Sequence, residues 1–409
     1  MCHHDADLEE ILNSVRKYNM RLNPTKCSFG VKAGKFLGFM LTNRGIEANP
    51  AKCQAIIDMR SPTSVKEVQQ LTGIIGALAR FISCSGEKAF HFFSTLRKSE
   101  CFIWTQECED AFRKLKEFIS SPPILTRPTE GNPLFLYLAV SEHALSSVLV
   151  QEVEKEERPV YFVSRVFRGA ESRYQKIEKL ALAVVVTARR LRPYFQGHRI
   201  IVKTDYPIKY VLRKPDLAGR IVAWSVELSE FDITFIPRGP IKAQLLADFA
   251  LELSAPSGEL ASQVWILSVD GASNLKGSGA GVVLEGPDGV LIEQSLRFEF
   301  RSRNNQVEYE ALIAGMKLAI EMEVKELRAK RDSQLVTSQV AGKFQTKDPQ
   351  LIKYLSKVKG LIAKFKFFEL TYVPREQNAR ADLLSKLAST KKSGTNRTVI
   401  QETIPTPST

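Results

Sequence analysis

Four acidic residues in the last third of the sequence could together bind divalent metal ions: Asp270, Glu308, Asp332 and Asp382. Asp and Glu supply the hard anionic oxygens that Mg²⁺ prefers, and a pair of ions about 3.5–4 Å apart needs a cluster of such ligands. The acids are predicted at a strand end, on a helix face, after the next strand and in the last helix. Because these points can converge on one edge of a mixed sheet, the pattern predicts a site for two divalent metal ions.

Three of these acids also have simpler interpretations. Asp270 follows the apolar run VWILSV and precedes a glycine, so it could be a turn residue. Asp332 could cap the helix that it opens. Asp382 could be an exposed acid on a helix. Each alternative is reasonable alone, but four acids at distinct points of one sheet favour a common cause.

The fourth acid, Glu308, shares a helix face with Leu312 and Leu318 and is predicted to point into the protein. Glu310 lies on the opposite face and is predicted to be solvated. An isolated buried charge is costly, so Glu308 needs either a metal ion or an ion pair with a nearby arginine.

Composition narrows the class of protein. A chain of 409 residues suggests two or three domains. The net charge of +13 fits a nucleic-acid partner, or a basic protein that binds no polyanion. The six cysteines form no C-x-x-C pair, which argues against a zinc site and favours an intracellular compartment, cytoplasmic or nuclear. No apolar run approaches the ~18–20 residues of a membrane span, so no membrane partner is expected.

The chain divides into three blocks, a linker and a tail. Residues 1–125 are predicted to be mainly helical, with a strand pair between residues 35 and 46. Residues 126–253 and 264–389 repeat one plan of three sequential strands followed by alternating helices and strands, which predicts two mixed sheets of the α/β (α+β) class. The polar linker 254–263 separates them, and the tail 390–409 is predicted to be disordered. The predicted strands are 134–140, 146–151, 159–163, 200–204 and 233–237, then 264–269, 279–284, 290–295, 326–330 and 368–373.

The third block resembles type 1 ribonuclease H of the short, archaeal-like kind. The matching segments are VDGASN with AGVVL, NNQVEYEALIAGMKLA, RDSQLVTSQVAG and VPREQNARADLLSKLA. The resemblance implies that Asp270, Glu308, Asp332 and Asp382 are metal ligands and catalytic residues for two Mg²⁺ ions, with Mn²⁺ as a possible substitute. It also implies cleavage of the RNA strand of an RNA–DNA hybrid. Some family members place a histidine near the last Asp, and this block has none.

The resemblance also suggests how the strand to be cut is recognised. RNA is distinguished from DNA through its 2′-hydroxyls, which line the minor groove. Asn304, Asn305 and Gln306 are candidates for these contacts because they lie just before Glu308. A helix cap at Asn304 is the alternative.

The second block resembles the RNase H domain that follows reverse transcriptase in gypsy-type LTR retrotransposons. LYLAVSEHALSSVLV, RYQKIEKLALAVVVTARRLRPYF, VKTDYPIKYVL and IKAQLLADFALEL carry the match. Ala139 and Leu180 stand where this family has its first Asp and its helix Glu, so only Asp205 and Asp248 remain. Two carboxylates are a poor site for two Mg²⁺ ions, so this degenerate copy is predicted to be inactive, with Asp205 as a helix cap.

The first block resembles the end of the palm, the thumb and the connecting segment of the same reverse transcriptases. The chain lacks a Y-x-D-D turn, so polymerase activity is not expected from it. The resemblance as a whole implies an RNA–DNA hybrid as partner, together with other retroelement proteins such as integrase or the remainder of reverse transcriptase. The competing hypothesis is a catalytically inactive, nucleic-acid-binding relic of a retroelement polyprotein.

Overall fold

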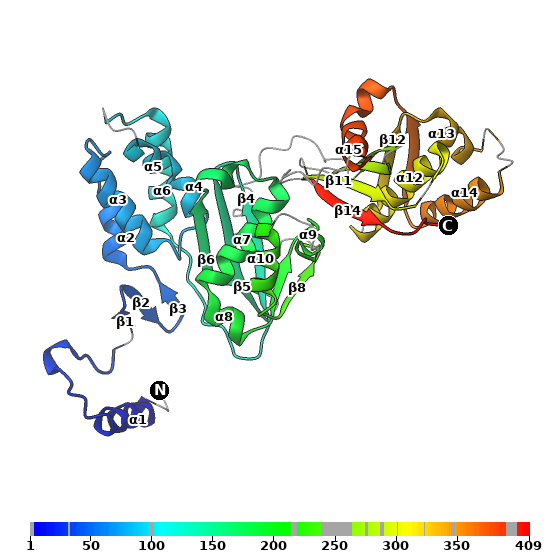
Figure 1. Ribbon diagram of the computed structural model, residues 1–409. Coiled ribbons are helices and arrows are strands. Elements are labelled where there is room, and N and C mark those ends of the chain that lie inside the picture. The colour runs from blue at the N-terminus through cyan, green and yellow to red at the C-terminus, as the bar shows by residue number, and fades with distance from the viewer. Residues whose placement is uncertain are drawn as a thin grey trace.

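The computed structural model describes most of the chain and shows a helical amino-terminal part followed by two mixed sheets flanked by helices (Figure 1). The described residues are 4–31, 33–97, 102–154, 156–213, 219–238, 264–274, 277–286, 290–300, 302–322, 324–342, 344, 348–389 and 399–409. Within these ranges, no helix has both the length and the apolar character needed to cross a membrane.

The amino-terminal part combines a small antiparallel sheet with a helical cluster. The strands are β1 (Ala33–Phe36), β2 (Phe39–Thr42) and β3 (Gly45–Glu47). The helices are α1 (His4–Lys17), α2 (Pro50–Ile57), α3 (Val65–Leu78), α4 (Ser85–Lys88), α5 (Phe90–Arg97) and α6 (Gln106–Ser120). Ser64 caps α3, because its hydroxyl accepts a hydrogen bond from the Glu67 amide at 3.4 Å. The core of this cluster continues onto one face of the second part, where it includes Tyr137 and Phe162.

The second part has a five-stranded sheet in the order β6-β5-β4-β7-β8. The strands are β4 (Leu134–Val140), β5 (Ala144–Val153), β6 (Glu156–Val166), β7 (Ile200–Lys203) and β8 (Ile233–Ile236). The first three are antiparallel, and β7 and β8 join in parallel. The helices are α7 (Lys176–Arg190), α8 (Arg192–Gly197), α9 (Ile208–Arg213) and α10 (Gly219–Leu228).

The third part repeats this topology in the order β13-β12-β9-β10-β11-β14. Its strands are β9 (Trp265–Asn274), β10 (Gly277–Gly286), β11 (Val290–Phe298), β12 (Glu326–Arg331), β13 (Phe367–Tyr372) and β14 (Ile400–Ile404). The helices are α12 (Asn304–Glu321), α13 (Gln334–Val340), α14 (Pro349–Ile362) and α15 (Ala379–Ser389), the last preceded by the 3-10 helix η4 (Arg375–Asn378). The predicted repeat of one supersecondary plan is therefore confirmed.

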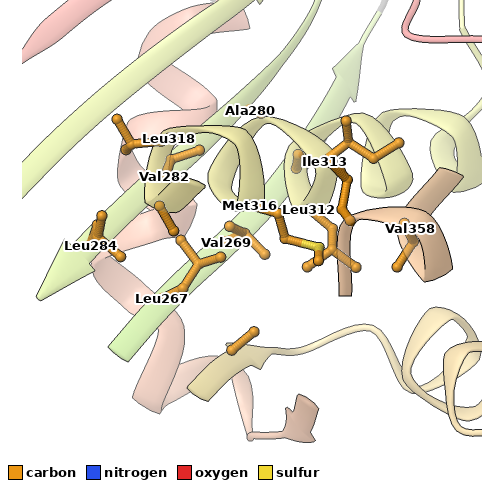
Figure 2. Close-up of a cluster of buried hydrophobic side chains, with 14 of the residues drawn as sticks. Leu267, Val269, Ala280, Val282, Leu284, Leu312, Ile313, Met316, Leu318 and Val358 are labelled. Carbon is orange, nitrogen blue, oxygen red and sulfur yellow. The ribbon is translucent and has the colours of Figure 1, made fainter. Parts of the chain in front are cut away.

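The core of the third part lies between α12 and the sheet. Figure 2 shows Leu312, Ile313 and Met316 of α12 against Leu267 and Val269 of β9, all of them buried. On the opposite face of the sheet, α15 packs across β9, β10 and β11. This core holds β9, α12 and β12 together, whereas α15 packs through a smaller, separate cluster of Val283, Ala381 and Leu384.

The prediction of a disordered tail is wrong for its last part. Residues 390–398 lie outside the described residues, but β14 pairs in parallel with β11. The pairing is reinforced by a hydrogen bond of 2.6 Å from Gln294 Nε2 to Glu402 Oε2, and Ile404 packs against the core. The polar composition of the tail obscured the alternating segment IQETI, whose backbone groups complete the open edge of β11.

Candidate functional site

Asp270 lies in the middle of β9, because the strand continues to Asn274. The interpretation of Asp270 as a turn residue is therefore wrong. The residue is only 6% exposed and is opposite Gly281 in the sheet. Its Oδ2 accepts a hydrogen bond of 2.7 Å from Ser385 Oγ of α15. A buried carboxylate is thus held between the sheet and the last helix.

Two glycines let the helices approach Asp270 closely. A Cβ on Gly271 would lie 3.0 Å from Val307 and 3.1 Å from the Glu308 amide nitrogen, so this glycine allows β9 to touch the start of α12. A Cβ on Gly281 would lie 2.7 Å from the Ser385 amide nitrogen, so any side chain larger than hydrogen would overlap with α15. The absence of side chains at Gly271 and Gly281 therefore allows α12 and α15 to pack close to the strand that carries Asp270.

Glu308 points inward, as predicted, and forms an ion pair with Arg331 at the end of β12. Its side chain is 17% exposed, and that of Arg331 is fully buried. The Arg331 Nη1 also donates to the Glu308 carbonyl oxygen at 3.4 Å. The ion-pair alternative for Glu308 therefore describes a contact that the structure contains.

The prediction that Glu310 is solvated is wrong. Glu310 is 1% exposed, and its Oε1 accepts hydrogen bonds from Tyr354 Oη at 2.7 Å and from the Ser408 amide at 2.5 Å. The helical wheel of α12 could not show that α14 and the tail cover its second face. The buried Glu310 therefore belongs to the attachment of those segments.

Asp332 follows β12 directly and comes beside Asp270 through the strand register. Lys330 pairs with Ser268 in the parallel β12–β9 ladder, and each site aspartate lies two residues further on. Helix α13 begins at Gln334 with Ser333 as its N-cap, so the interpretation of Asp332 as a cap is wrong.

Asp382 is the acid with the most basic neighbours. Its side chain is 12% exposed, which rules out an exposed helix acid. Oδ1 accepts from Arg375 at 2.6 Å, and Oδ2 accepts from Lys386 at 2.5 Å. The Asn378 side-chain amide donates to the Val269 carbonyl oxygen at 3.0 Å and so fixes η4 beside Asp270.

The electrostatics show that the four carboxylates share one region. Burial raises the pKa of Asp270, and the charges of Asp332 and Asp382 raise it further. Burial also raises the pKa of Glu308 to about 7, against the lowering effect of Arg331 and with additional repulsion from Asp270 and Asp332. Burial would raise the pKa of Asp382 as well, but its hydrogen bonds to Lys386 and Arg375 outweigh this, and the pKa is lowered.

The donor set suits a hard divalent cation, because it consists of four carboxylates on four elements. In the part of the chain that the structure describes, no three His, Cys, Asp or Glu side chains form a ready-made cation site. Glu308 and Asp382 instead hold basic side chains. The residue types therefore suit Mg²⁺. In this structure Arg331, Arg375 and Lys386 neutralise part of the negative charge.

The three amides before Glu308 lie at the start of α12. Asn304 and Asn305 are exposed, whereas Gln306 is half-buried. Gln306 Oε1 accepts from the Arg303 amide at 3.0 Å, and its Nε2 donates to Gln350 at 2.8 Å. Arg303 is the N-cap, so the cap interpretation of Asn304 is wrong.

In the second part, Ala139 and Leu180 occupy the positions that Asp270 and Glu308 occupy in the third part. Leu180 is the fifth residue of α7, as Glu308 is of α12, and it is buried in the apolar core. Ala139 of β4 is opposite Ser146, as Asp270 is opposite Gly281. Asp248 lies outside the described residues.

Asp205 follows β7 as Asp332 follows β12, but it is exposed, and its Oδ1 accepts from the Arg238 amide at 2.9 Å. The prediction of Asp205 as a helix cap is wrong, because its hydrogen bond joins two loops. The second sheet thus retains the positions of the site without its acids at Ala139 and Leu180.

Arg331, Ser385 and Asn378 were missed by the sequence reasoning. Arg331 directly precedes Asp332, and its place at a predicted strand end was the available signal. Ser385 follows Asp382 by three residues, one helical turn, and could have been found by the helix periodicity. No local signal marks Asn378 as the residue that binds the β9 backbone.

Two family models each match one part of the chain. Residues 104–202 match the RNase H-like domain found in reverse transcriptase, and residues 268–388 match the reverse transcriptase-like family. Foamy viral protease-reverse transcriptase in complex with an RNA/DNA hybrid aligns with 96% of this chain and 57% of its own, at a TM-score of 0.52 and 17% identity. That likeness shows the fold, a mixed α/β architecture with RNase H-like domains.

Among curated proteins, the chain is similar in sequence to retrotransposon Pol polyproteins. It is 33% identical over 236 residues to the Pol polyprotein from transposon 297 of Drosophila melanogaster, which covers 55% of this chain and 22% of the relative. It is 28% identical over 229 residues to that from transposon 412 of the same organism, which covers 56% and 18%. The chain thus spans about a fifth of the length of these relatives, and a gypsy-type origin is consistent with them.

Proposed function

We propose that the third part of the chain is a ribonuclease that hydrolyses the RNA strand of an RNA–DNA hybrid. The observation that carries the proposal is the convergence of Asp270, Glu308, Asp332 and Asp382 from a strand, a helix, a strand end and the last helix. The charge of Asp270 acts on Glu308, and those of Asp332 and Asp382 act on Asp270. Asp270 is therefore the central ligand of the proposed site.

Two Mg²⁺ or Mn²⁺ ions would supply the activation of an attacking water and the stabilisation of the leaving oxygen. The protein side chains position that chemistry. Ser385 fixes the Asp270 carboxylate, and the glycines at 271 and 281 keep α12 and α15 at the distance that the site needs. The exposed amides of Asn304 and Asn305 stand one helical turn before Glu308, where contacts to 2′-hydroxyls would select the RNA strand.

The second part is proposed to be catalytically inactive. Ala139 has no ligand atom, and Leu180 is 2% exposed in an apolar core. A carboxylate would be required at both positions for a comparable set of ligands. A polymerase function is likewise not proposed for this chain.

The duplicated fold supplies a matched control for the test. Purified full-length chain, a labelled RNA–DNA hybrid and MgCl₂ would be combined, and cleavage by Asp332→Asn compared with cleavage by Asp205→Asn. Asp332→Asn is expected to lower the rate at least about 100-fold, since it alters a proposed metal ligand. Asp205→Asn is expected to cleave at the wild-type rate, because an amide oxygen can still accept from Arg238.

Two outcomes would overturn the proposal. One is an absence of cleavage by the wild-type chain in both Mg²⁺ and Mn²⁺, and the other is equal cleavage by Asp332→Asn and the wild type. Binding of the hybrid without cleavage would instead support the relic that only binds nucleic acid.

A further inference from the structure

Arg331 is a charged side chain in an unusual position. It ends β12, is 0% exposed and directly precedes Asp332. Burying a guanidinium costs several kcal/mol unless it is paired and hydrogen-bonded. In the described part of the chain its Nε has no hydrogen-bond partner, so this burial is only partly compensated.

Among the described residues, both hydrogen-bonding contacts of Arg331 are made to one residue of the proposed site, Glu308. Its Nη2 is paired with the Glu308 carboxylate, and its Nη1 donates to the Glu308 carbonyl oxygen at 3.4 Å. The charges of Asp332 and Asp270 also act on the guanidinium. One fixed positive charge therefore lies among three of the four site carboxylates.

We propose that Arg331 is a built-in counter-ion that holds Glu308 in the metal-free protein and sets the affinity of the site for divalent cations. This inference rests on the proposed function, because it takes Glu308 as a metal ligand. A guanidinium on the carboxylate occupies an oxygen that a cation would use, so ion binding requires Glu308 to leave Arg331. The remaining positive charge then opposes the cation over a short distance in a poorly solvated region.

The alternative is an ion pair that serves folding alone and has no influence on cation binding. The two differ in the sign of one measurement. A counter-ion that competes with Mg²⁺ weakens its binding, so removing Arg331 strengthens it. If the ion pair serves folding alone, removing Arg331 leaves Glu308 less well positioned, and Mg²⁺ then binds equally or less well.

The test is calorimetric titration of MgCl₂, and separately MnCl₂, into the full-length chain. Arg331→Met is expected to bind Mg²⁺ at least about tenfold more tightly than the wild type, since a like charge beside the cation is removed. It is also expected to melt at a lower temperature without metal and to gain more from added Mg²⁺. Arg328→Met is the matched control, because Arg328 lies in the same strand but is exposed and pairs with Glu369. Unchanged or weaker Mg²⁺ binding by a folded Arg331→Met overturns the inference.

A second measurement uses the wild-type chain, so it does not depend on the folding of a variant. The side-chain Nε–H signal of Arg331 in ¹⁵N-arginine-labelled protein, assigned with Arg331→Lys, is expected to shift as MgCl₂ binds. A signal that stays in place while calorimetry shows binding overturns the inference.

The inference and the proposed function fail in different ways. If the wild type cleaves the hybrid and Arg331→Met binds Mg²⁺ no more tightly, only the counter-ion role is overturned. If Arg331→Met gains Mg²⁺ affinity but neither protein cleaves, the counter-ion role stands and the ribonuclease proposal falls. If neither protein binds either ion, both are overturned.

Discussion

The substitution Gly281→Ala tests whether the close packing of α15 against the sheet positions the residues of the proposed site. A Cβ on Gly281 would lie 2.7 Å from the Ser385 amide nitrogen and 2.8 Å from Leu384 Cβ, and closer still to the Ala381 carbonyl oxygen. Ordinary contacts lie at about 3.5–4.0 Å, so α15 must retreat by roughly 1 Å. Because the obstacles are backbone and Cβ atoms, no side-chain rotation can relieve the overlap.

The expected loss of stability is about 1–3 kcal/mol, the usual effect of overpacking a closely packed region. The retreat also carries Asp382 and Ser385 away from Asp270. A misplacement of about 1 Å in a catalytic constellation can lower the rate about 100-fold. The substitution should therefore reduce hybrid cleavage well beyond the fraction of protein that unfolds.

The assay combines urea unfolding with hybrid cleavage in MgCl₂ at a temperature where every variant is folded. Gly360→Ala is the matched control, because Gly360 lies inside α14 and a Cβ there would meet no atom within 4 Å. That control should gain up to about 1 kcal/mol from helix propensity and keep its activity. Wild-type cleavage and stability in Gly281→Ala would refute the reasoning that close approach at Gly281 positions the last helix.

Three further results are expected. Burial raises the pKa of Glu308 from 4.5 to about 7, so its contribution to the stability of the metal-free chain should be present below pH 4.5 and lost as the pH rises through 7. Melting profiles from pH 4 to 8 check this, and a profile identical to that of Glu308→Gln would contradict it. Tyr354→Phe should cost about 1–3 kcal/mol in urea unfolding, because Glu310 loses a buried donor, while Tyr372→Phe at a half-exposed position should change stability by less than about 0.5 kcal/mol. Leu180→Glu should destabilise the second part by at least about 3 kcal/mol without altering hybrid cleavage, and a loss of cleavage in folded protein would place that position in the active machinery.

Much of the fold could be predicted because the central strands are short, mostly apolar segments of the sequence. The predicted strand 134–140 coincides with β4, and the helix predicted to carry Glu308 is α12. Central strands such as β5 and β10 are buried along most of their length, because helices cover both faces of their sheets. Short apolar runs therefore marked them in the sequence.

The errors lie where contacts come from distant segments. Glu310 was placed in solvent because a helical wheel does not contain Tyr354 or Ser408, which lie 44 and 98 residues away. Asp270 was placed at a strand end because the polar residues GASN hide the continuation of β9. The parallel register of β12 beside β9 nevertheless brings Asp332 next to Asp270.

The ion pairs of the site were the least predictable feature. Glu308 was expected to need a cation or an arginine, and the desolvation argument cannot choose between them. Arg331 became identifiable only when the register of β12 beside β9 turned its side chain inward. The sequence therefore predicted the acidic residues, and the structure added the basic side chains that pair with Glu308 and Asp382.

The strand β14 has a consequence for how copies of this protein behave toward each other. It covers the stretch of β11 from Gln294 to Phe298, whose backbone groups would otherwise form an open sheet edge. Exposed edges of this kind recruit strands from neighbouring chains, whereas a short strand with a charged residue such as Glu402 discourages such pairing. The third part prepared without residues 399–409 should therefore be prone to aggregate, so these eleven residues matter for its solubility.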